Sequence, residues 1–305
     1  GCCHLFPLAS NKKVTTTPSP CHLFTCGDIG AILQLADLSY LYYKGENMCL
    51  ILFACDYHPK YKLVVAANRD EFYSRPTQPA AFWQDNPYLL AGKDLKEGGT
   101  WMGITTTGRF AALTNYRDPS RHKKDAPSRG HLVHKYLIDT MTPSAYVEQI
   151  PDGGEAYNGF NLLMGDGESL YYYSNRQQQL QEVPAGIHAL SNALLNDPWP
   201  KAIKGKQELQ AALHEGQVNV EWLFAILADQ EQPDDEDLPH TGVSLEMERM
   251  LAPAFVTMPN YGTKTSTVIL IERCQQVRFW ERTFIKASPD VWNEVHYEFK
   301  LHPPA

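Results

Sequence analysis

The sequence lacks an excess of positive charge. Its 305 residues include 27 lysines and arginines against 35 aspartates and glutamates, a formal net charge of −8. Proteins that bind nucleic acids usually present a basic face, so this balance argues against that class. No apolar run reaches the roughly 20 residues that a helix needs to cross a bilayer. The 43% of hydrophobic residues is ordinary for a globular chain and sufficient for a sizeable core.

The cysteines and histidines offer neither a disulfide framework nor a metal site. Four of the seven cysteines lie within the first 26 residues, and Cys49, Cys55 and Cys274 are scattered. This pattern is typical of reduced thiols in a cytoplasmic protein. His131 and His134 are three positions apart, but no third ligand accompanies them. We therefore expect no metal and no required cofactor.

Residues 1–47 differ from the rest of the chain. They have no convincing hydrophobic period, and Ala31–Leu41 lacks the basic neighbouring segment of a signal peptide. Lys44–Met48 reads like a translated bacterial ribosome-binding site in front of a start codon. We expect residues 1–47 to be a non-native or disordered extension and residues 48–305 to form a single domain. The alternative is a short, poorly ordered true N-terminus.

The order of the expected elements indicates an α+β protein. Two apolar runs, Met48–Cys55 and Leu63–Phe72, flank a polar link and predict a β-hairpin. Further along, strands and helices come in blocks and not in regular alternation, which argues against a doubly wound parallel sheet. This order suits two stacked, mostly antiparallel sheets covered by helices on both outer faces. The other expected strands are 101–105, 109–114, 161–165, 170–174, 180–183, 187–190, 265–272 and 277–284, and the expected helices are 130–140, 143–150, 200–214 and 220–229; residues 75–92 are expected to be loop-rich.

Several ordered motifs carry a resemblance to a known family. Asn68-Arg69-Asp70-Glu71 follows an apolar strand, and the other motifs are Gly98–Gly103, Leu113–Tyr116, Leu190–Ala193 and Gly262–Thr267. Together they resemble the NRDE family, also called the transport and Golgi organisation family. The resemblance runs from Met48 to near the C-terminus. It implies a four-layer αββα sandwich like that of the N-terminal-nucleophile hydrolases.

Cys49 is the main candidate for chemistry. A cysteine is a strong nucleophile only as a thiolate, so it needs a base or a lowered pKa. If Met48 is removed, Cys49 carries a free α-amine, whose ordinary pKa of about 7.7–8.0 leaves it partly neutral at physiological pH. That amine is then the expected base. The competing interpretation is a buried strand cysteine without a catalytic role.

Other candidate residues follow the ends of expected strands. In related acylases a strand ends in Arg-Asn-x-Asp, and Asp70 matches the carboxylate that contacts the nucleophile's amine. Ala67 stands where that group has arginine. Asn115 and Asn192 resemble its oxyanion-binding asparagines, because amide N–H groups stabilise a developing oxyanion. For each, a turn-forming residue at a strand end is the alternative. The remaining residues expected to contact a substrate are Asn68, Arg69, Trp101 and Lys264, the last being the nearest counterpart of a late arginine.

Two functions from different classes follow from these candidates. The first is hydrolysis of a linear amide or acyl compound by Cys49, with Asp70, Asn115 and Asn192 in support. The second is a carrier or chaperone that binds a hydrophobic ligand such as haem or acyl-CoA without turnover, which the missing arginine favours. A structural protein with a degenerate pocket is the third interpretation. No nucleic-acid partner and no membrane span are expected.

Overall fold

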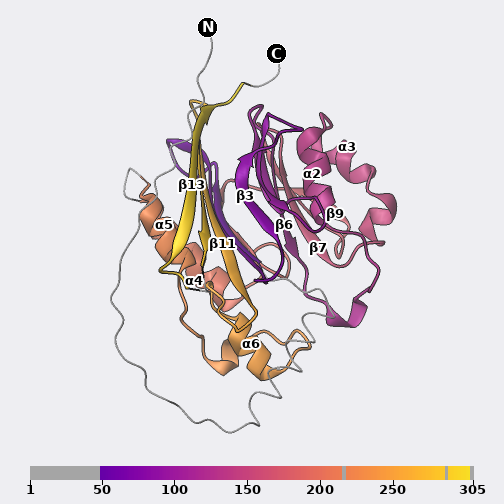
Figure 1. The fold of residues 1–305 in the computed structure, drawn as a ribbon, viewed down its shortest axis with the longest axis vertical. Coiled ribbons are helices and arrows are strands. Elements are labelled where there is room, and N and C mark those ends of the chain that lie inside the picture. Colours follow the sequence, from indigo (N-terminus) through magenta and orange to yellow (C-terminus); the bar gives the residue numbers. More distant parts are fainter. Residues whose placement is uncertain (1–48, 215–217, 286–287, 303–305) are drawn as a thin grey trace.

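The protein is an α+β sandwich of two antiparallel sheets (Figure 1). The computed structural model describes residues 49–214, 218–285 and 288–302, so the predicted extension at 1–47 lies outside the described residues. The first sheet has the strand order β10-β1-β2-β11-β12-β13 and the second the order β3-β4-β5-β6-β7-β8-β9. Every pairing that defines these orders is antiparallel. The predicted fold class is therefore confirmed.

The strands of the first sheet are β1 (Cys49–Cys55), β2 (Tyr61–Phe72), β10 (Gly186–Leu190), β11 (Tyr261–Glu272), β12 (Gln276–Phe284) and β13 (Trp292–Lys300). Those of the second are β3 (Thr77–Phe82), β4 (Leu89–Asp94), β5 (Met102–Thr105), β6 (Phe110–Asn115), β7 (Phe160–Gly165), β8 (Leu170–Ser174) and β9 (Gln179–Glu182). The helices are α2 (Gly130–Ile138), α3 (Pro143–Glu148), α4 (Pro200–Leu213), α5 (Val220–Leu227) and α6 (Leu245–Leu251). No helix of the described chain is long and apolar enough to span a bilayer.

Three separate apolar layers define the sandwich. Because side chains alternate along a strand, Ile51 and Phe53 of β1 point into the layer between the sheets, while Leu50 and Leu52 point to the other face. That other face packs against α4 and α5. A third layer lies between the second sheet and α2. Figure 1 shows α4 and α5 on one outer side and α2 and α3 on the other. The strands β1 and β2 are thus buried on both faces, which explains their almost continuous apolar sequence.

The prediction that residues 75–92 are loop-rich is wrong, because this segment contains β3 and the start of β4. Pro79 makes β3 hard to predict from the sequence, because proline has no N–H and cannot donate to a strand ladder. The pairing of β3 with β4 shifts register between Gln78 and Ala81, around this proline. β3 also forms an edge of its sheet, the position where a proline is tolerated.

The strand β13 and the helix α6 were also missed. β13 lies at an edge of the first sheet, and its side chains are mostly exposed or half-buried. Its sequence therefore has no apolar run. α6 has only seven residues, too few for a clear period. Other elements match the expected ranges within a few residues, as for α2, which ends at Ile138.

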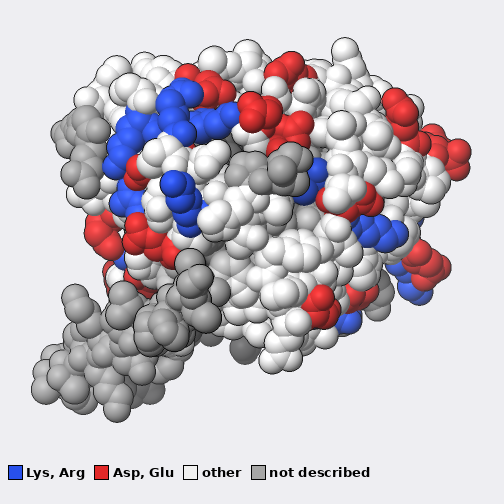
Figure 2. Space-filling view, turned by 90° about the horizontal axis from the view of Figure 1, so that it is seen from above, with Lys and Arg blue, Asp and Glu red and all other residues white. Residues whose placement is uncertain are grey.

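Charges of both signs lie on the surface. Figure 2 shows one end of the molecule, where lysine and arginine side chains gather with acidic ones beside them. The hairpin turns carry such pairs, for example Lys60 with Glu272 at 3.0 Å and Arg273 with Asp56 at 2.8 Å. Opposite charges are therefore interspersed there and do not form a broad basic face.

Candidate active site

The ends of three strands bring the predicted residues together. Cys49 is the first residue of β1 and lies opposite Arg69, near the end of β2. The other neighbour of β1 is β10, whose last residue, Leu190, pairs with Ile51. The segment that follows β10 therefore carries Asn192 to Cys49. β6 of the second sheet ends in Asn115, on the same side.

Hydrogen bonds connect Cys49 to both asparagines. The backbone N–H of Cys49 donates to Oδ1 of Asn192 at 3.3 Å, and Nδ2 of Asn192 donates to the backbone oxygen of Asn115 at 2.9 Å. The hydroxyl of Ser191 donates to the backbone oxygen of Cys49 at 3.0 Å. Asn192 thus holds the start of β1 against the end of β6. One N–H of its amide is used in this way.

The thiol of Cys49 is almost fully buried, with 8% of the residue exposed. Burial raises the pKa of this thiol to about 12, and the negative charge of Asp70 contributes in the same direction. Arg69 and the backbone N–H of Asp70 oppose the shift. The thiol is consequently protonated at neutral pH while its own nitrogen is a backbone amide. Chemistry at this sulfur requires a further positive charge or a base.

Asp70 is buried beside this thiol and has one unsatisfied oxygen. Its Oδ1 accepts a hydrogen bond from the hydroxyl of Thr263 at 2.7 Å, and its Oδ2 has no hydrogen-bond partner among the described residues. Burial raises the pKa of Asp70 to about 6, with Lys201 and Thr263 acting in the opposite direction. Because buried polar atoms are nearly always paired, an orphan carboxylate oxygen suggests that a donor is to be supplied.

The side chains of Cys49 and Asp70 leave the sheet on different faces. Cys49 lies opposite Arg69 in the ladder, so these two share a face, and Asp70, the next residue, points to the other. Both residues nevertheless line the same cavity at the strand ends. The carboxylate therefore acts on the thiol through its charge.

Lys201 is a functional candidate that the sequence interpretation missed. It lies in the first turn of α4, only 6% exposed, and its Nζ donates to the backbone oxygen of Leu251 at 2.9 Å. Burial lowers its pKa to about 8, against the raising effect of Asp70. A signal was present, because Lys201, Gly205 and Leu209 follow the four-residue spacing of one helix face, and all three are buried.

The cavity in front of Cys49 has a volume of about 580 Å³. Trp101, Leu113 and Asn115 line it together with the start of α2. Gly99 permits this arrangement, because a Cβ there would lie 2.6 Å from the backbone carbon of Gly130. The volume of the cavity falls within the usual range for small-molecule sites, roughly 300–1,000 Å³.

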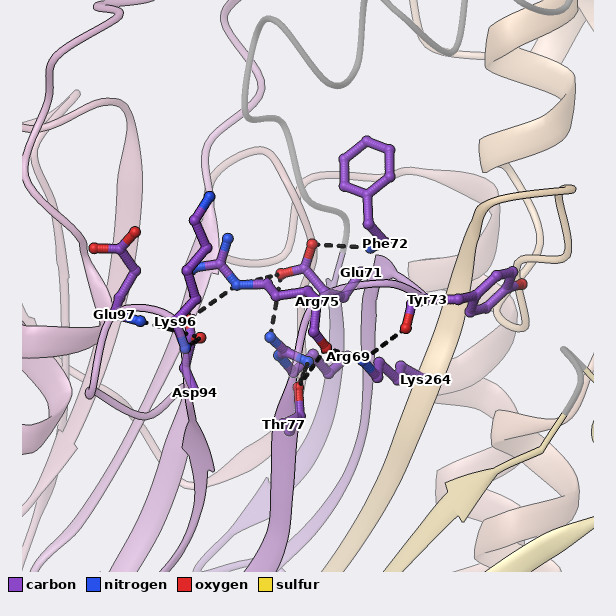
Figure 3. Close-up of polar contacts among 10 residues, drawn as sticks. All are labelled: Arg69, Glu71, Phe72, Tyr73, Arg75, Thr77, Asp94, Lys96, Glu97 and Lys264. Carbon is purple, nitrogen blue, oxygen red and sulfur yellow. Dashed lines mark hydrogen bonds and ion pairs between the residues drawn. The ribbon is translucent and has the colours of Figure 1, made fainter.

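Four charged residues, Arg69, Glu71, Arg75 and Asp94, form what we call the charged wall of this cavity (Figure 3). Glu71 Oε2 lies 3.1 Å from Nη2 of Arg69 and 3.4 Å from Nε of Arg75. Arg75 Nη2 lies 2.6 Å from Asp94 Oδ2. The guanidinium of Arg69 also stacks over Trp101, 4.3 Å from the ring centroid. The charges of this wall are paired, so it primarily fixes the shape of the cavity.

Two predicted substrate contacts are placed elsewhere. Lys264 lies in a β-bulge of β11, and its Nζ donates to the backbone oxygens of Tyr73 and Arg75, which anchors the turn after β2 (Figure 3). Asn68 points to the helix side, where its Nδ2 donates to the backbone oxygens of Leu227 and Ala254 at 2.8 Å each. Neither residue is among those that line the 580 Å³ cavity. Within the described ranges no group of three or more His, Cys, Asp or Glu residues could hold a metal ion.

Comparison with solved structures finds weak likeness to two hydrolases. A Caenorhabditis elegans ortholog of N-acylethanolamine-hydrolyzing acid amidase matches with a TM-score of 0.41 and 10% identity, over 73% of this chain and 92% of that one. A mutant conjugated bile acid hydrolase from Clostridium perfringens matches with a TM-score of 0.43 and 9% identity, over 85% and 98%.

The sequence comparison finds much greater similarity than the comparison with solved structures. The Transport and Golgi organization protein 2 homologs of Bos taurus and Homo sapiens are 39% and 38% identical, over 279 and 275 residues, in each case 83% of this chain and 99% of the relative. The Drosophila melanogaster protein Transport and Golgi organization protein 2 is 30% identical over 281 residues, 82% of this chain and 98% of its own length. The profile of the family described as Transport and Golgi organisation 2 matches residues 48–286. The chain therefore belongs to the Transport and Golgi organisation 2 family.

Proposed function

We propose that this protein hydrolyses a linear amide or acyl compound, with Cys49 as the nucleophile and the α-amine of Cys49 as the base. The observation that carries the proposal is the buried Oδ2 of Asp70, which has no hydrogen-bond donor among the described residues. Asp70 lines the same cavity as Cys49, the first residue of β1. A free amine at Cys49 supplies both a donor and a positive charge for a buried carboxylate. The backbone N–H of Cys49 already faces Oδ1 of Asn192, so that oxygen is a second acceptor for the amine.

The same amine offsets the high pKa of the Cys49 thiol in two ways. In its protonated form an ammonium next to the sulfur lowers the thiol's pKa, since an opposite charge favours the thiolate. In its neutral form it accepts the thiol proton. The thiolate then attacks the acyl carbon, and the amine returns the proton to the leaving nitrogen as the C–N bond breaks. Water, deprotonated by the same amine, hydrolyses the thioester to a carboxylic acid and restores the thiol.

The remaining residues have supporting roles in this proposal. Asn115 lines the cavity with Cys49, so its side-chain amide is the expected donor to the oxyanion, and Asn192, which bonds to the backbone of Asn115, supports it. Trp101 and Arg69, stacked on each other, form the floor on which the acyl group rests. The three described cysteines are free thiols, which suits a reducing compartment such as the cytoplasm.

A second candidate function is binding of acyl-CoA or haem without turnover. It is favoured by the exposed lysines Lys96 and Lys124 at the cavity, because both ligands carry anionic groups beside an apolar body. In that function the protonated thiol of Cys49 has no chemical task.

The test compares the chain made from Met48 with the chain that retains residues 1–47. Both are screened for hydrolysis of N-acyl amino acids and acyl-CoAs, and intact mass reports whether Met48 or the extension is removed. Loss of a general base typically costs about 10²- to 10⁴-fold in rate, so the uncleaved extended form should be slower by that factor. Cys49→Ser should abolish most turnover. Cys55→Ser, at the other end of the same strand, is the matched control and should retain it.

Two outcomes contradict the proposal. Equal activity of both chains, with intact mass showing no cleavage, excludes the amine as base. Absence of activity in both, together with saturable acyl-CoA or haem binding that survives Cys49→Ala, favours the carrier function.

A further inference from the structure

A fully buried asparagine, Asn161, lies between the two sheets near the candidate active site. It is the second residue of β7 and is 0% exposed. Leu163, two positions along the strand, belongs to the apolar layer between the sheets, so Asn161 points to the same face. Asn161 is not among the residues that line the 580 Å³ cavity. Buried polar groups are nearly always hydrogen-bonded, so the partners of this amide show what it holds in place.

The side-chain amide of Asn161 makes three hydrogen bonds. Its Nδ2 donates to the backbone oxygen of Ala193 at 2.8 Å and to Oγ1 of Thr114 at 3.0 Å. Its Oδ1 accepts a hydrogen bond from the hydroxyl of Tyr172 at 2.8 Å. The carbonyl oxygen of Ala193 can only accept, so it fixes which way round the amide lies. Asn161 thus joins β6, β8 and the segment that follows β10.

The hydroxyl of Tyr172 contacts the same segment after β10. The backbone N–H of Leu195 donates to this hydroxyl at 3.3 Å. A backbone N–H can only donate, so the hydroxyl hydrogen is directed to Oδ1 of Asn161. Two side chains of the second sheet therefore hold the carbonyl of Ala193 and the N–H of Leu195. These two residues follow Asn192 in the chain, so the second sheet fixes the path of the segment that carries Asn192.

The two ends of this connection lie next to the two asparagines of the candidate site. Thr114 precedes Asn115 at the end of β6, in the second sheet, and Ala193 follows Asn192, beyond a strand of the first sheet. We infer that Asn161 is a positioning residue that sets the separation of Asn115 and Asn192, with its amide held in orientation by Tyr172. The consequence for catalysis rests on the proposed function, whereas the placement of the segment after β10 does not.

The chain offers a matched control in a second buried asparagine, Asn175. Its Oδ1 accepts from the backbone N–H of Phe160 at 2.9 Å, and its Nδ2 donates to the backbone oxygens of Gly154 at 3.1 Å and Asn158 at 3.2 Å. Asn175→Ala therefore removes the same side chain and the same number of hydrogen bonds as Asn161→Ala. None of the three bonds of Asn175 reaches the segment after β10.

The placement is tested without any substrate by hydrogen exchange of backbone amides in the full chain, followed by NMR. The N–H of Arg117 donates to the backbone oxygen of Asn192 at 2.7 Å, so its protection reports how well that segment is docked. In Asn161→Ala we expect Arg117 to exchange about tenfold faster relative to the amides of the central strand β2, because a buried carbonyl and a buried hydroxyl lose their partner. In Asn175→Ala this ratio should not change. An equal ratio in the two variants would overturn the inference.

A milder pair of substitutions serves if Asn161→Ala does not fold. Tyr172→Phe removes the hydroxyl that bonds to Asn161 and Leu195. Tyr173→Phe is its control, because the hydroxyl of Tyr173 donates to the backbone oxygen of Gly153 at 2.8 Å, on the opposite face of β8. Faster relative exchange at Arg117 is expected in Tyr172→Phe alone, and its absence counts equally against the inference.

The effect on catalysis is measured in the form of the chain that shows activity. Asn161→Ala should lower kcat by up to about 10²-fold, the scale of a misplacement of about 1 Å, and should leave KM within about twofold. In an Asn115→Ala background most of this loss should disappear, since Asn161 acts through the asparagine that has been removed. The same loss of kcat in both backgrounds refutes the positioning role.

Failure of the inference and failure of the proposed function give different results. If no form hydrolyses any substrate while the exchange of Arg117 responds to Asn161→Ala alone, the proposed function fails and the placement by Asn161 stands. If Cys49-dependent hydrolysis is found but Arg117 exchanges alike in the Asn161→Ala and Asn175→Ala variants, the inference fails and the proposed function stands.

Discussion

Replacement of Asp70 by asparagine should stabilise the protein at neutral pH while it removes activity. Burial raises the pKa of Asp70 from 3.8 to about 6, so the folded state resists ionisation of this carboxyl group. A shift of about two units corresponds to about 3 kcal/mol, at about 1.4 kcal/mol per unit. Asparagine keeps an acceptor for Thr263 and carries no charge. The variant avoids the cost of ionisation that the native residue bears.

The sign of the pH dependence follows from the direction of the shift. Below pH 3.8 the carboxyl group is protonated in both the folded and unfolded states, and ionisation costs nothing. Above pH 6 it is ionised in both, and the full cost applies. The stability difference between Asp70→Asn and the native protein should therefore change by about 2 kcal/mol in favour of the variant between pH 4.5 and pH 7.

Urea unfolding at pH 4.5, 5.5 and 7, followed by tryptophan fluorescence, measures this difference. Asp290→Asn removes an exposed carboxylate and serves as the control. A difference that is independent of pH, or one that moves against the variant as pH rises, would refute the reasoning. Such a result would mean that Asp70 is better solvated or better paired than its burial and its orphan oxygen indicate.

Three further substitutions have defined outcomes. Asn192→Ala removes the hydrogen bonds to the buried backbone N–H of Cys49 and the buried carbonyl of Asn115, and urea unfolding should show a loss of about 2–6 kcal/mol, at about 1–3 kcal/mol for each group. In Gly99→Ala the new Cβ presses against the backbone of Gly130, which should lower the free energy of unfolding by about 1–3 kcal/mol. An unchanged midpoint of urea unfolding would show that the start of α2 moves to accommodate the Cβ. Arg117→Met leaves the buried carboxylate of Glu248 without its ion-pair partner and should lower stability by about 3–5 kcal/mol, whereas a small change measured by calorimetry would mean that other donors suffice.

The central hairpin was predictable from sequence because it is buried on both faces. Its strands are continuous apolar runs, and the polar link between them marks the turn, so the register of Cys49 against the end of β2 follows. The same reasoning failed at two of the sheet edges, β3 and β13. β13 is too exposed to show an apolar run, and β3 contains Pro79. β13 receives little of its stability from burial, so its sequence carries little of the signal.

The candidate site was predictable only where strand ends converge. Cys49, Asp70 and Asn115 line one cavity, and Asn192 bonds to the backbones of Cys49 and Asn115 beside it. Lys264 does not join them, because a bulge turns it toward the backbone after β2, and a bulge has no reliable sequence signature. Lys201 was overlooked because lysines on an amphipathic helix are normally solvated, and its burial results from packing between distant elements.

The pairing of β2 with β11 also has a consequence for biosynthesis. Thr263 and Asp70, which share a hydrogen bond, are 193 positions apart in the chain. During translation β2 emerges long before its partner, and until then the hairpin of β1 and β2 exposes an apolar edge. The cell must therefore protect a nascent chain that is almost complete in length but lacks its central strand pairing. Premature stop codons before β11 should yield products that chaperones or proteases remove, even though every predicted catalytic side chain has already been synthesised.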